Sequence, residues 1–129
     1  MRSFPVPLYK NTLQVFTDRG EFARFRRNHT DCPVNLEEAD GICSYYGHFV
    51  LIGIFNKRME TISHECAHAS MRIIDGAGIE VSLPNSEAVC YLLGWITETV
   101  CGEVFGKKSM VKLYKESDQR SGASSPTTI

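Results

Sequence analysis

Residues 61–70 read Thr-Ile-Ser-His-Glu-Cys-Ala-His-Ala-Ser, a stretch that contains the spacing His-Glu-x-x-His. On an α-helix, residues four apart lie one turn apart on the same face, so the imidazoles of His64 and His68 would point at one place. The carboxylate of Glu65 would lie beside them, close enough to reach a water bound there. The spacing is typical of a zinc site with an activated water and a carboxylate base.

The rest of this stretch also favours a helix. Apolar residues recur at spacings of four, three and four residues, namely at Ile62, Cys66, Ala69 and Ile73. They form a stripe opposite the histidines, so we expect one face to be buried and the other to hold the chemistry. The helix is expected to end near Gly76 and Gly78. Cys66 projects away from the histidines, which favours core packing over metal binding.

A site with two histidines needs a third protein ligand, and the candidate is Glu87. Eighteen residues separate it from His68, and it follows a helix-start signal at residues 82–85. Apolar residues at helical spacing continue this second segment, while its other side carries Glu87, Tyr91, Gly94 and Glu98. Gly94 has no side chain, so another helix could approach closely there. Two such helices would build a His₂Glu site with a fourth position open for water.

The third ligand has competitors, and Glu87 has a second possible role. A carboxylate at the start of a helix is also favoured by the helix dipole, which would account for Glu87 without a metal. Cys90, one turn later, is a competing zinc ligand. Asp75 lies about 10 Å along the helix from His68 by the rise per residue, too far to share its ion.

The pattern His64-Glu65-Cys66-Ala67-His68, then eighteen residues, then Glu87 within Asn-Ser-Glu-Ala, resembles the gluzincin branch of the zinc metallopeptidases. The resemblance covers roughly residues 40–105. It implies that Zn²⁺ is held by His64, His68 and Glu87, with Glu65 as general base. It implies a small α+β zincin-like domain, in which an antiparallel or mixed sheet packs on the motif helix and a second ligand-bearing helix. The implied function is hydrolysis of peptide bonds in a protein or peptide substrate.

Gluzincins of larger size place a further catalytic His or Tyr later in the chain. Here no histidine follows His68, so the candidates are Tyr91, Tyr114 and His48. Tyr91 lies one turn from Glu87, where it could donate a hydrogen bond to an oxyanion or to a ligand. The alternative for Tyr91 is an amphipathic aromatic of the core, which is the more common use of tyrosine.

Length and composition are those of a single folded domain. The chain has 129 residues, of which 43% are hydrophobic, enough for a core of its own. A net charge of -1 gives no general attraction to nucleic acid or to a membrane. We expect no membrane segment, because no apolar run approaches the required length, and no signal peptide, because residues 1–5 do not begin an apolar core. The five scattered cysteines favour reduced thiols in a cytoplasmic protein.

Upstream of the motif the sequence predicts strands and one helix. A strand is expected over residues 8–16, a short helix over 21–27 after a cap at Thr17-Asp18, and two strands around a turn near Gly47. The second of those two strands is almost continuously apolar and should be buried on both faces, whereas the first is a candidate edge. In zincin-like enzymes an edge strand beside the metal receives the peptide as an added strand. The resemblance implies that role for residues 42–46.

The C-terminal part is the least informative. Residues 107–115 are predicted as a short strand or helix. We therefore expect a single zincin-like domain over 1–115 and a flexible polar tail over 116–129.

A chain this short has little material for the second wall of a substrate cleft. The alternative to a peptidase is therefore a non-catalytic, zinc-containing binding or regulatory protein, with a specific protein partner that completes the cleft. A third alternative is a metal-free structural protein in which the motif is accidental.

Overall fold

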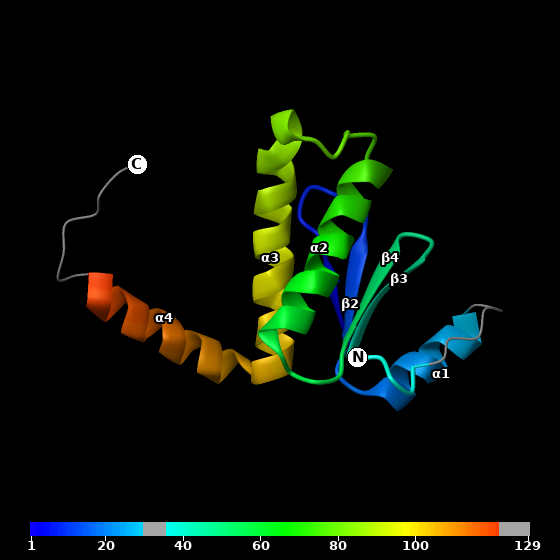
Figure 1. Ribbon diagram of the computed structural model, residues 1–129, viewed down its shortest axis with the longest axis horizontal. Helices are drawn as coiled ribbons and strands as arrows, with labels where there is room; N and C mark the ends of the chain where they lie inside the picture. Colours follow the sequence, from blue (N-terminus) through cyan, green and yellow to red (C-terminus); the bar gives the residue numbers. More distant parts are fainter. Residues whose placement is uncertain (30–35, 122–129) are drawn as a thin grey trace.

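The computed structural model describes residues 1–29 and 36–121. Within them it is an α+β structure with one four-stranded mixed sheet (Figure 1). The strands are β1 (Arg2–Pro5), β2 (Thr12–Phe16), β3 (Gly41–Tyr46) and β4 (Phe49–Ile54). The helices are α1 (Arg19–His29), α2 (Met59–Gly76), the 3₁₀ helix η1 (Leu83–Asn85), α3 (Ser86–Phe105) and α4 (Lys107–Ser121). The predicted α+β class is confirmed.

The sheet places the predicted edge strand at its border. The strand order is β1-β2-β4-β3, with β2 and β4 parallel and the two outer pairs antiparallel. β4 is buried almost throughout, as its apolar run predicted. The turn between β3 and β4 contains Gly47 at φ 57°, in the left-handed region where a side chain is strained.

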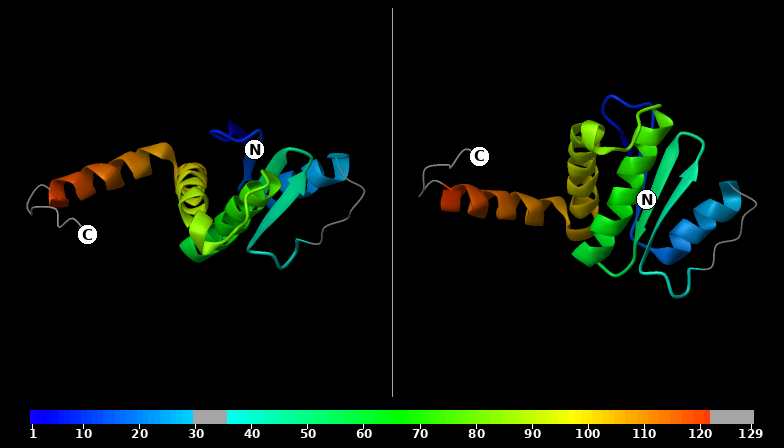
Figure 2. Two further views of the ribbon diagram at one scale, coloured as in Figure 1. Left: turned by 90° about the horizontal axis from the view of Figure 1, so that it is seen from above. Right: turned by 45° about the horizontal axis from the view of Figure 1, so that its top comes forward.

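Helices cover both faces of the sheet (Figure 2). On one face α2 and α3 pack over inward-pointing residues of β2 and β4, such as Leu13 and Ile52. On the other face Phe22 of α1 packs with Phe16 and Leu51. The predicted apolar stripe of the motif helix is buried in the first of these clusters, with Ile62, Cys66, Ala69 and Ile73 at most 2% exposed.

The N-terminal segment differs in part from the prediction. The Asp18 side chain caps α1 as expected, since its Oδ1 accepts a hydrogen bond from the Glu21 amide at 2.8 Å. β2 lies inside the predicted strand over 8–16. β1 was not predicted, and it ends at Pro5, a residue that is disfavoured in strand interiors. The structure places β1 at the outer border of the sheet, where a missing amide donor is tolerated.

One prediction about α3 is wrong. Gly94 was expected to let a second helix approach, but nothing lies within 4 Å of where its Cβ would stand. α2 instead packs on another side of α3, where the Ser70 hydroxyl donates to the Val89 carbonyl oxygen at 2.8 Å. The side of α3 that carries Glu87, Tyr91, Gly94 and Glu98 is exposed. A glycine at helical spacing does not by itself indicate which side of the helix is packed.

The C-terminal helix α4 leaves the body of the domain and projects away from the sheet (Figure 1). It continues to Ser121, so the predicted boundary at residue 115 falls inside a helix and residues 116–121 are not an irregular tail. The remainder of the predicted tail, residues 122–129, lies outside the described residues.

The segment Leu83–Phe105 is long and apolar enough to cross a membrane by length and composition. This corrects the expectation that no apolar run reaches that length. Core helices of soluble proteins pass the same test, and Leu92, Ile96 and Val100 of α3 are buried against the rest of this domain. Length and composition alone do not separate the two cases.

Candidate metal centre and its flanking strand

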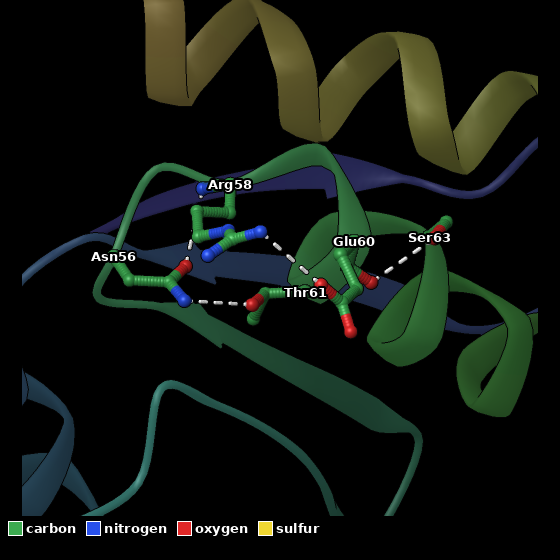
Figure 3. A network of polar contacts seen from close by, with 5 residues as sticks. All are labelled: Asn56, Arg58, Glu60, Thr61 and Ser63. Atoms are coloured by element: carbon green, nitrogen blue, oxygen red, sulfur yellow. Dashed lines mark hydrogen bonds and ion pairs between the residues drawn. The ribbon is translucent and has the colours of Figure 1, made fainter.

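A polar network at the junction of β4 and α2 sets where the motif helix begins (Figure 3). The Asn56 amide donates to the Thr61 hydroxyl at 2.9 Å, and its carbonyl oxygen accepts from the Arg58 amide at 3.1 Å. Arg58 also pairs with Glu60 at 3.4 Å. Because these contacts fix the first turn of α2, they also fix the direction in which His64 points one turn later.

The two motif histidines meet at their ring nitrogens. His64 and His68 are both exposed, and their Nε2 atoms are 3.2 Å apart. Two nitrogens bound to one tetrahedral zinc ion at about 2.0–2.1 Å lie about 3.3–3.4 Å apart. The spacing of this pair therefore fits two ligands of a single zinc ion. It also fits a hydrogen bond between the rings in which one nitrogen is protonated.

Glu65 lies between this pair and the start of β3. It is 9% exposed and, with His64, lines a hollow of about 260 Å³. Gly41 allows the close approach of β3 to α2 at this point. A Cβ at Gly41 would stand 2.4 Å from Cγ2 of Thr61 and 3.2 Å from Cγ of Glu65. The carboxylate is thus held at the wall of the hollow by strand and helix together.

The third predicted ligand lies apart from the pair. Glu87 is exposed on the first turn of α3. Among residues 1–29 and 36–121, no three His, Cys, Asp or Glu side chains lie close enough together to hold a metal ion. Cys90, the competing ligand, is also exposed. Ligation by Glu87 therefore remains a prediction from the sequence, and the structure brings together only the two histidines and Glu65.

Cys66 packs in the core, as predicted. Its side chain is buried between α2 and α3, and burial raises the pKa of its thiol to about 12. Cys66 belongs to the same buried cluster as Ile62 and Ile73, on the face of α2 opposite the exposed histidines. This burial agrees with core packing rather than metal binding.

Tyr45 of β3 is a neighbour of the site that sequence analysis missed. Its hydroxyl donates to the His68 carbonyl oxygen at 3.3 Å and accepts from the Cys43 thiol at 3.3 Å. Burial is the main reason that the pKa of Tyr45 is raised, so the phenol remains a donor. Strand alternation places Cys43 and Tyr45 on one face. Only the fold shows that this face is turned towards α2.

The two tyrosines and the histidine that were candidates for oxyanion stabilisation lie elsewhere. Tyr91 is 78% exposed and lines a hollow with residues 7–9, not the one at His64. The Tyr114 hydroxyl donates to Glu98 at 2.8 Å. His48 lies in the turn after β3, where its ring lies against that of Phe49 at a tilt of 34°. None of the three lines the hollow beside Glu65.

The outer edge of β3 is available beside the histidines. Its antiparallel partner β4 occupies one side, and no other described segment makes a backbone hydrogen bond with β3. The strand runs alongside α2, from Gly41 next to Glu65 to Tyr45 next to His68. An extended peptide added there would pass along the row of motif residues.

Comparison with known proteins does not add an identification. No family model matches the chain, and no curated protein or solved structure is significantly similar to it.

Proposed function

We propose that this chain is a zincin-like, zinc-dependent metallopeptidase. The observation that carries the proposal is the 3.2 Å approach of the His64 and His68 Nε2 atoms beside Glu65. Two imidazoles converging from one helical face, with a carboxylate next to them and a free strand edge alongside, match the needs of metal-assisted peptide hydrolysis. The proposal does not depend on any one identity for the third ligand.

In this mechanism His64 and His68 would hold the ion, with Glu87 as the third ligand that the sequence resemblance implies. Zn²⁺ bound there would act as a Lewis acid and lower the pKa of a bound water. Glu65 accepts the proton of the attacking water and later returns it to the leaving nitrogen. Its position at the wall of the hollow keeps the carboxylate near both partners in these transfers. Tyr45 positions the His68 turn against β3 through its hydrogen bond to the His68 carbonyl.

The substrate would bind as an added strand on β3. Backbone pairing holds an extended peptide with little demand on its sequence, so affinity comes from the strand and selectivity from flanking hollows. The hollow beside Glu65 includes Asn56 and Arg58 in its lining. These polar groups would contact the part of the peptide that lies near the start of β3.

The first experiment separates metal binding from hydrolysis. Zinc content would be measured after dialysis, together with cleavage of a peptide library, for the wild type, Glu65→Gln and His68→Ala. We expect Glu65→Gln to keep its zinc and lose hydrolysis, because it removes only the proton acceptor. We expect His68→Ala to lose both. Suitable controls are Glu80→Gln and His48→Ala, which make the same changes outside the site. Full hydrolysis by Glu65→Gln would remove that residue from the mechanism.

The second experiment addresses the third ligand. Glu87→Ala should lower zinc affinity by at least about tenfold if the carboxylate binds the ion. Glu80→Ala, another exposed carboxylate in the segment between α2 and α3, should leave the affinity unchanged. Equal affinity in both variants would exclude Glu87 as a ligand while leaving the histidine pair in place. Zinc titration against a competing chelator provides the measurement.

A binding or regulatory protein with a zincin-like site is the second candidate. It is favoured by a largely apolar hollow outside the site, whose lining includes the exposed side chains of Leu8, at 101%, and Tyr91, at 78%. Apolar patches on a soluble domain often mark contact surfaces. Zinc binding without turnover of any library peptide, together with a stable complex with one protein, would favour this candidate.

A further inference from the structure

A second hollow, of about 520 Å³, lies beyond His68 between the C-terminal half of α2, the end of β3 and residues 8–11. Two cations line it, Lys10 and Arg72, and so do the polar side chains of Tyr45 and Asn11. No Asp or Glu is among its lining residues. The hollow is therefore suited to an anion rather than to a cation.

The two cations are not neutralised by the fold. Neither Lys10 nor Arg72 forms an ion pair with another residue of the described chain. Arg72 is held in place by the Tyr45 ring, since its Cζ lies 4.7 Å from the ring centroid. A guanidinium stacked on a ring keeps its N–H groups free to donate at its rim, where a carboxylate can accept two of them. The next carboxylate along α2, Asp75, does not line the hollow.

This hollow lies next to the candidate metal centre, although the two share no lining residue. Arg72 follows His64 and His68 at the same four-residue spacing, so the three lie along one side of α2. Tyr45 contacts both the hollow and the metal centre. Its ring lies under the Arg72 guanidinium, and its hydroxyl donates a hydrogen bond to the His68 carbonyl oxygen. Arg72 lies about 6 Å further along the helix than His68. An extended peptide advances about 3.3 Å per residue, so this offset corresponds to about two residues.

The direction of β3 determines which part of a peptide reaches the hollow. β3 starts at Gly41 beside Glu65 and reaches Tyr45 beside Arg72. Antiparallel pairs are the more frequent kind of strand pairing. A peptide added antiparallel to β3 therefore places residues from its N-terminal side at Arg72, and residues from its C-terminal side near Gly41.

We propose that Arg72, Lys10 and Tyr45 form a subsite for a carboxylate of the bound peptide. The occupant is an Asp or Glu side chain about two residues to the N-terminal side of the bond that lies over the histidines. A C-terminal carboxylate offers the same chemistry, but it would require the peptide to pair parallel to β3. The position relative to a cleaved bond rests on the proposed function, whereas recognition of a carboxylate does not.

The test measures peptide binding without turnover. Short fluorescent peptides with amidated C-termini would carry one Glu, scanned along the chain, and be compared with matched Gln peptides. A further Gln peptide would have a free C-terminus. Anisotropy titrations would use zinc-loaded Glu65→Gln protein, alone or combined with Arg72→Gln, Arg72→Lys or Lys10→Gln. The matched control is Arg27→Gln, an exposed cation on α1, which lies on the other face of the sheet.

We expect a Glu peptide to bind about three- to tenfold tighter than its Gln partner. Arg72→Gln should abolish that preference. Arg72→Lys, which keeps the charge but loses the stacked, two-pronged geometry, and Lys10→Gln should each reduce it, whereas Arg27→Gln should leave it unchanged. A preference for the free C-terminus that is lost in Arg72→Gln assigns the carboxylate to the chain end and the peptide to the parallel direction. Equal binding of all peptides, or a preference that Arg72→Gln leaves unchanged, overturns the subsite. Absence of hydrolysis by the zinc-loaded wild-type protein, with this preference intact, would contradict the peptidase alone.

Discussion

At the scale of single residues, the site depends on Gly41 as much as on the residues that would carry the chemistry. The place where its Cβ would stand is 2.4 Å from Thr61 and 3.0 Å from the Gly53 carbonyl oxygen. Thr61 cannot turn away freely, because its hydroxyl accepts the Asn56 hydrogen bond at the start of α2. The absence of one methyl group therefore lets β3 lie against Glu65.

Gly41→Ala should accordingly damage both stability and the site. Overpacking at a buried contact typically costs about 1–3 kcal/mol of unfolding free energy. We expect hydrolysis to fall further than stability explains, because the added methyl group displaces Glu65. The control is Gly94→Ala, at an exposed helical position with open space around it, which should stabilise the protein by about 0.5–1 kcal/mol. Urea titration and peptide cleavage would measure the two effects. Unchanged activity in folded Gly41→Ala would contradict this account of the strand contact.

At the scale of elements, the helices and strands that the sequence predicted correctly are those with a strong apolar pattern among residues close together in the chain. The motif helix, the buried strand β4 and the edge strand β3 all occur where they were expected. In each, the spacing of apolar residues along the sequence is the spacing typical of that kind of element. Which sides of two helices face each other is not local information. Gly94 was predicted to lie at a contact between two helices because it has no side chain. In the structure it lies on the exposed side of α3. Tyr45 was missed because its importance arises from the pairing of β3 with a helix distant in sequence.

The Ser70 hydrogen bond to Val89 is where α2 and α3 are fixed in register, and it lies two residues from Glu87. Ser70 is fully buried, so Ser70→Ala should lower the free energy of unfolding by about 1 kcal/mol. If Glu87 binds the ion, the same change should also weaken zinc binding several-fold, because α3 is freed to shift. Ser63→Ala, an exposed serine on the same helix, is the control. Equal zinc affinity in Ser70→Ala and wild type would separate the position of α3 from the metal site.

At the scale of the whole molecule, the domain is a sheet covered on both faces, with α4 attached at one corner. The predicted boundary at Lys115 followed the change to polar composition, but polar residues at helical spacing extend a helix as readily as they form a tail. Gly106, at φ 88°, ends α3 and turns the chain into α4. The structural boundary of the sheet and its covering helices therefore lies at Gly106 rather than at Lys115.

Removal of residues 107–129 tests that boundary. α4 packs on α3 and contributes Met110 to the edge of the core, while its Tyr114–Glu98 hydrogen bond is exposed. We expect the chain ending at Gly106 to fold and to bind zinc as the full chain does. Its stability should fall by about 1–2 kcal/mol, the amount expected for one partly buried methionine and its neighbours. The variant Met110→Ala in the full chain should reproduce most of that loss, whereas Lys112→Ala, at an exposed position of α4, should not. Circular dichroism during thermal unfolding and zinc titration would measure these effects. Failure of the shortened chain to fold would make α4 an integral part of the domain.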